Sequence, residues 1–84
     1  MQPQVVVSAF KSMTDELCEK CEKADSLEKL NCIADKFDGA RKTIVWIMAF
    51  CQPDVEDLFY PLLADARQTF KSARNAAFER LTKI

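Results

Sequence analysis

The sequence contains no histidine, one glycine and three prolines, and two of these scarcities exclude classes of protein. Without histidine, the commonest general acid–base side chain is missing. With only Gly39, a glycine-rich phosphate loop cannot form. The longest uncharged apolar run, residues 43–51, is far shorter than the ~20 residues that a membrane-spanning helix needs. We therefore expect no enzyme, no bound cofactor and no membrane-spanning protein.

The composition of the 84 residues fits one small folded domain. Hydrophobic residues make up 49% of the chain and charged residues 30%, which suffices for a core and a water-exposed surface. At this length we expect a single helical domain, residues 1–84. The first residues lack the basic start and apolar stretch of a secretory signal, so we expect a cytoplasmic protein.

Apolar residues recur at steps of three and four along almost the whole chain, which is the spacing of amphipathic helices. The first stripe comprises Val6, Phe10, Met13, Leu17, Cys21 and Ala24. The last stripe comprises Val55, Phe59, Leu62, Ala66, Phe70, Ala73, Ala77, Leu81 and Ile84. Because each stripe needs a partner surface, the pattern predicts an all-α fold, an antiparallel three-helix bundle with helices of roughly 20, 26 and 30 residues.

Polar and special residues set the expected helix boundaries. The first helix is expected over residues 5–24, and Asp25 with Glu28 forms a capping box that starts the second. The second helix passes through Gly39, because the same apolar face resumes after it. Pro53 suits the first turn of the third helix, and Pro61 predicts a kink in that helix.

The four cysteines, at positions 18, 21, 32 and 51, are expected to be reduced thiols. Cys18 and Cys21 have half of the spacing of a zinc knuckle, but they fall inside a helical stripe and no histidine completes a site. We therefore predict no metal site. A small thiol or metal protein that uses Cys18, Cys21 and Cys32 stays as a rival interpretation.

Charge is distributed unevenly, although the net charge is only −1. Acidic residues outnumber basic ones in residues 1–39, and the reverse holds in residues 65–84. The first and last helices either attract each other in the fold or leave a basic docking face for an acidic partner. The candidates for that face are Arg67, Lys71 and Arg74, which follow one helix face. A pI near 5.3 disfavours nucleic acid.

Two further sets of residues are candidates for contacts with other proteins. Trp46 lies beside the apolar face of the second helix and is either a partly buried boundary residue or a partner-binding anchor, and Tyr60 is a second possible anchor. The last helix is expected to be longer than the first, which would leave part of its apolar face uncovered. We therefore predict a homo-oligomer that associates through Phe70, Ala77, Leu81 and Ile84.

The order of several features resembles the first half of the N-terminal helical domain of cyclase-associated proteins. These features are Ala9-Phe10 near the start of the first helix, Phe37 four residues before Arg41, and Pro53 and Pro61 in the third. Where that family has a glycine-glycine turn, this chain has Ala24-Asp25-Ser26. The resemblance implies a protein that binds actin and acts with cofilin in filament disassembly, without enzymatic activity.

The sequence therefore predicts a non-enzymatic helical protein-interaction module, with actin as the partner that the resemblance implies. A self-associating subunit of a larger helical assembly is the main alternative.

Overall fold

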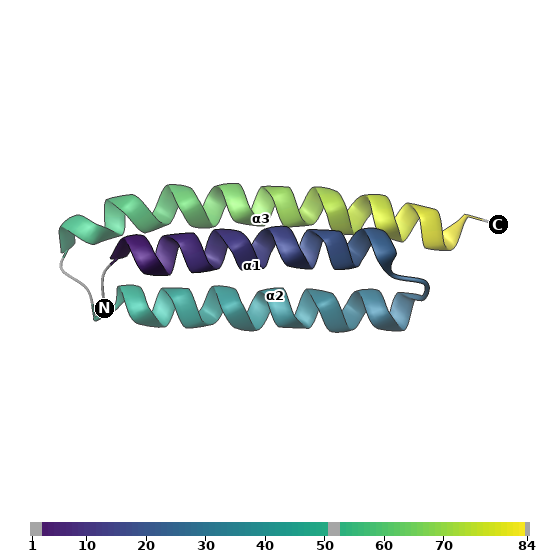
Figure 1. Cartoon of the computed structure of the whole chain (residues 1–84), viewed down its shortest axis with the longest axis horizontal. Coiled ribbons are helices and arrows are strands. Elements are labelled where there is room, and N and C mark those ends of the chain that lie inside the picture. Colours follow the sequence, from purple (N-terminus) through teal and green to yellow (C-terminus); the bar gives the residue numbers. More distant parts are fainter. Residues whose placement is uncertain (1–2, 51–52, 84) are drawn as a thin grey trace.

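The chain folds into an antiparallel three-helix bundle, as the apolar pattern predicts (Figure 1). The computed structural model describes residues 3–50 and 53–83, and the side-chain surroundings of residues 4–50 and 59–83. Helix α1 spans Pro3–Lys23, α2 spans Leu27–Met48 and α3 spans Pro53–Thr82. Each helix packs on the other two, in a rod of 50 × 17 × 16 Å. No helix in the described part of the chain is long and apolar enough to cross a membrane.

The start of α2 is capped by Ser26, so the predicted cap at Asp25 is wrong. Ser26 has an extended backbone, and its hydroxyl accepts a hydrogen bond from the backbone N–H of Lys29 over 3.2 Å. The capping residue is the one just before the first helical residue. Since α2 begins at Leu27, that position belongs to Ser26. The carboxylate of Asp25 instead pairs with the Lys29 ammonium at 2.9 Å, and this hydrogen bond and charge lower the pKa of Asp25.

Neither special residue inside a helix breaks it. Helix α2 continues through Gly39, as expected, and a Cβ atom at that position would meet no heavy atom within 4 Å. Packing therefore does not require a glycine there. Helix α3 continues through Pro61, and its ribbon bends over the first turns (Figure 1).

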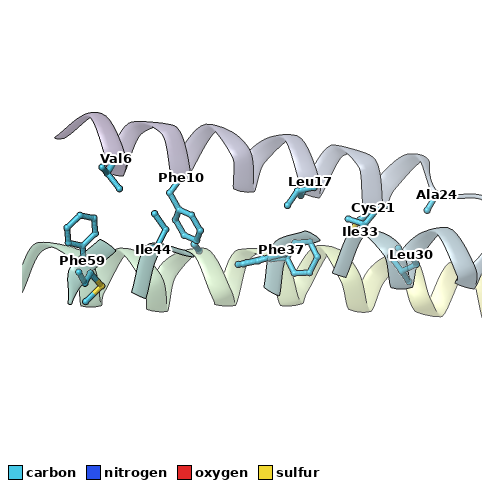
Figure 2. Close-up of a cluster of buried hydrophobic side chains, with 14 residues drawn as sticks. Val6, Phe10, Leu17, Cys21, Ala24, Leu30, Ile33, Phe37, Ile44 and Phe59 are labelled. Atoms are coloured by element: carbon cyan, nitrogen blue, oxygen red, sulfur yellow. The ribbon is translucent and has the colours of Figure 1, made fainter. Parts of the chain in front are cut away.

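Three phenylalanines, one from each helix, meet in the middle of the core. The Phe37 ring lies edge-on to both others, with centroids 6.0 Å from Phe10 and 4.3 Å from Phe70. Aromatic pairs in this geometry are favourable by about 0.5–1.5 kcal/mol beyond the area they bury. Figure 2 shows Phe10 and Phe37 pointing into the space between the helices. All three rings are buried, so this cluster fixes how the helices pack.

The polar groups of the core are paired. The Thr14 side chain is buried, and its hydroxyl donates to the Phe10 carbonyl at 2.9 Å, one helical turn earlier. Among the described residues, no buried side-chain nitrogen or oxygen lacks a hydrogen-bond partner. The core therefore carries no uncompensated cost of buried polar groups.

The end of α1 is held by Arg80, which lies near the end of α3. The Nη2 atom of Arg80 donates to the backbone carbonyls of Cys21, Glu22 and Ala24, at 3.2, 3.0 and 2.8 Å. These carbonyls lie at the C-terminal end of α1, where a helix lacks internal donors and carries partial negative charge. A cation from another helix thus caps α1 and ties the two ends together.

Candidate functional site

A groove of about 750 Å³ runs between α2 and α3. Small residues on both helices, Ala34 and Ala64, line it where larger side chains would fill the space. The α3 wall carries Arg67, Lys71 and Arg74, which we call the basic stripe. The α2 wall carries Asp35, Asp38 and Arg41. The structure therefore brings the three predicted cations together along one wall of a single groove.

The basic stripe is not neutralised by the rest of the described chain. All three of its side chains belong to exposed residues. Every salt bridge among the described residues lies elsewhere and joins neighbours along the chain: Glu16–Lys20, Asp25–Lys29 and Asp38–Arg41. None of these pairs joins α1 to α3, so no described salt bridge carries the attraction expected between the first and last helices. A charged contact between these helices is instead made by Arg80, which donates to carbonyls at the end of α1. The stripe is free to meet charges outside the molecule.

Trp46 lies near the end of α2 and is 71% exposed, so its interpretation as a partly buried boundary residue is wrong. Its ring packs edge-on to Phe50, with centroids 5.3 Å apart, and Phe50 is also exposed. Trp46 is not among the residues that line the groove, so the structure does not combine it with the basic stripe in one site. Its role as a partner-binding anchor stays a prediction.

The self-association prediction rested on an uncovered apolar face at the end of α3, and the structure covers most of it. Phe70 and Ala77 are buried within the single chain, and Leu81 is partly buried against the core. Phe70 is covered because it packs against Phe37 of α2, and the last turns of α3 lie beside the end of α1, where Arg80 binds. Ile84 lies outside the described residues. The exposure expected at Phe70 and Ala77 is therefore wrong, and self-association through Leu81 and Ile84 stays a prediction.

The described cysteines occupy three different environments. Cys21 is fully buried, Cys18 is partly buried with its Sγ 4.0 Å from the Thr69 carbonyl oxygen, and Cys32 is exposed. Burial raises the pKa of both the Cys18 and Cys21 thiols. Asp15 and Glu22 raise the pKa of Cys18 further, whereas the pKa of Cys21 is raised further by Cys18 and Glu22 and lowered by Arg74. Among the described residues no group of three or more potential ligands is placed to hold a metal ion. Cys51 lies outside those residues.

These environments predict an order of alkylation. The thiolate is the reactive form, so burial and a raised pKa both slow the reaction of Cys21 with iodoacetamide. In native protein we expect Cys32 to react first and Cys18 more slowly. Cys21 should react at least about tenfold more slowly than Cys32, because the buried Cys21 thiol becomes accessible only when the surrounding helices open locally. Mass spectrometry of time points measures the order. Urea-unfolded protein is the control, since all cysteines should react alike there, and native Cys21 reacting as fast as Cys32 would contradict the prediction.

Comparisons with models of protein families, with curated protein sequences and with solved structures found no match to this chain. The resemblance to cyclase-associated proteins therefore stays a prediction, and the function must be argued from the groove.

Proposed function

We propose that this chain is a non-enzymatic helical protein-interaction module that binds an acidic protein through the basic stripe. The observation that supports the proposal most strongly is the set of three exposed cations on one helix wall, none of which has a salt-bridge partner among the described residues. Charges arranged in this way contribute little to folding and instead steer association and select partners. A rigid helix presents them at fixed spacing.

The chemistry of the groove favours binding over catalysis. The chain has no histidine, and the described residues that line the groove include no cysteine or serine. The usual nucleophiles and the usual general base are therefore missing from this groove. Its two carboxylates are Asp35 and Asp38, and the latter pairs with Arg41 at 3.5 Å.

Actin is the first acidic partner to test, because it is the partner that the resemblance to cyclase-associated proteins implies. Trp46 is kept in the proposal as a second contact, since an exposed tryptophan beside Phe50 is a typical interface anchor.

Reversing two charges of the basic stripe tests the proposal. In co-sedimentation with actin filaments, Lys71→Glu/Arg74→Glu is expected to bind at least about tenfold more weakly than the wild type, with a larger difference at low salt. The free energy of unfolding should change by less than about 1 kcal/mol, because these side chains are exposed and unpaired.

The matched control is Lys11→Glu/Lys36→Glu, which makes the same change in net charge at two exposed lysines outside the groove. It should bind like the wild type. Equal weakening by both variants would show that only net charge matters. A wild type that does not bind actin at any salt concentration would remove actin as the partner.

A further inference from the structure

The basic stripe is the middle of a longer line of residues on α3. Steps of four and three residues connect the members of this line, which place them on one face of the helix. At its two ends lie aromatic side chains that are exposed by 60% for Tyr60 and 52% for Phe78. We call this line the α3 flank: Tyr60, Ala64, Arg67, Lys71, Arg74 and Phe78. It presents an apolar residue, a positive centre and a second apolar residue.

The wall on α2 follows the same periodicity. Ala34, Asp38 and Arg41 line the groove at steps of four and three, and Val45, four residues further, is about half exposed. Because α2 runs antiparallel to α3 and Phe37 lies beside Phe70, Val45 lies toward the Tyr60 end of the groove. Val45 and Tyr60 are therefore exposed at the same end of the α2–α3 pair, beyond the residues that line the groove.

The dimensions and charge of this surface select the occupant. From Tyr60 to Phe78 the flank extends about 27 Å at 1.5 Å per residue, which is about five helical turns. Four cations and two carboxylates line the groove, so its charge is positive. Cations line the groove, and the exposed side chains of Tyr60 and Phe78 follow on the same face of α3 beyond the two ends of its lining. This arrangement fits an amphipathic helix whose centre is acidic.

We infer that the groove between α2 and α3 binds an acidic amphipathic helix of another protein. Its carboxylates pair with Arg67, Lys71 and Arg74, and its apolar residues at the two ends pack on Tyr60 and Phe78. The inference rests on the proposed function and specifies the form of the partner. The net charge of −1 and the pI near 5.3 disfavour nucleic acid as the occupant.

A second copy of the chain matches the groove only in part. Its α1 carries three exposed carboxylates, Asp15, Glu19 and Glu22, at the same spacing as the basic stripe. The position that would then face Tyr60 is Ser8, and α1 ends at Lys23, before it could reach Phe78, so α1 of a second copy supplies no apolar contact at either end. The observations therefore favour a different protein over self-association.

The probe is a fluorescently labelled synthetic helix, which we call the acidic peptide. Leucines occupy the two positions that face Tyr60 and Phe78, and glutamates occupy the three positions that face the basic stripe. A peptide of the same composition with these residues scattered around the helix is the matched control. By fluorescence anisotropy the wild-type chain should bind the acidic peptide at least about tenfold more tightly than the scattered one.

Two kinds of variant separate the contributions to binding. Lys71→Glu/Arg74→Glu, which reverses two charges, should weaken binding of the acidic peptide at least about tenfold. Lys71→Gln/Arg74→Gln, which only removes these charges, should weaken it less. Tyr60→Ala/Phe78→Ala should also weaken it by about tenfold. Phe50→Ala, an exposed aromatic outside the α3 flank, and Lys11→Glu/Lys36→Glu should bind like the wild type. Circular dichroism confirms that each variant is folded.

Each alternative result identifies what is wrong. The charge variants could weaken binding while Tyr60→Ala/Phe78→Ala does not. The basic stripe would then bind acidic groups without a helix lying in the groove, so the inference would fail and the proposed function would survive. Equal binding of both peptides, or none, overturns the inference. Concentration-dependent dimers in sedimentation equilibrium that Lys71→Glu/Arg74→Glu abolishes would show that a second copy is the occupant. Actin failing to bind while the acidic peptide binds leaves the inference standing.

Discussion

Replacing Phe37 with alanine is expected to lower the free energy of unfolding by about 3–5 kcal/mol. Phe37 is buried and contacts both Phe10 and Phe70, so its removal leaves a cavity where the three helices meet. A domain of this size has only about 5–15 kcal/mol of stability, so the loss is a large part of the total. Urea denaturation followed by circular dichroism measures it.

Phe50→Ala is the matched control, because it makes the same substitution at an exposed ring whose aromatic partner is Trp46. It should cost less than about 1 kcal/mol. Similar losses for the two variants would mean that Phe37 does not pack in the core as the structure has it.

Replacing Arg80 with alanine is expected to lower the free energy of unfolding by about 2–3 kcal/mol, although Arg80 belongs to the surface. The substitution leaves the carbonyls of Cys21, Glu22 and Ala24 without their charged donor and removes a cation from the negative end of α1. Arg80→Lys should recover about half of the loss, because it keeps the positive charge while its ammonium group is more strongly hydrated than a guanidinium.

Arg74→Ala provides the comparison for Arg80→Ala. Arg74 lies six residues earlier on α3, is exposed and forms no salt bridge among the described residues. Its removal should therefore change stability by less than about 0.5 kcal/mol. Thermal and urea unfolding of the two variants measure the difference. If Arg80→Ala is as mild as Arg74→Ala, the carbonyls of α1 are not capped by this side chain in solution.

Much of the fold was predictable because it depends on local periodicity. The apolar stripes place Phe10, Phe37 and Phe70 on the inner faces of their helices, and the structure buries all three. The resumption of the apolar face after Gly39 correctly predicts a continuous α2. Where two neighbouring residues can serve the same role, as Asp25 and Ser26 can, the pattern does not decide, and the helix begins one residue later than expected.

Long-range contacts could not be predicted from the same patterns. Arg80 is separated from its carbonyl partners on α1 by more than fifty residues, and only the packing of α3 beside α1 brings them together. The packing of α3 on the other two helices also covers Phe70 and Ala77, which the expected helix lengths alone had left uncovered. Relative helix lengths therefore do not determine which surface is exposed.

The candidate site was predictable in part. The spacing of Arg67, Lys71 and Arg74 indicated one helix face, and that face is exposed in the structure. The groove itself needed the position of α2, because its second wall is formed by Asp35, Asp38 and Arg41. Tyr60 and Phe78 follow the same periodicity as the cations, and this signal in the sequence would have extended the site to both ends.

The central claim is that the basic stripe pairs with carboxylates on a partner helix, and an exchange of charges tests it most directly. In the exchanged peptide, lysines replace the three glutamates of the acidic peptide. In fluorescence anisotropy, Lys71→Glu/Arg74→Glu should bind the acidic peptide more weakly than the wild type does. It should bind the exchanged peptide at least about tenfold more tightly than the wild type does. A reversed variant that binds the exchanged peptide no better than the wild type would contradict the claim.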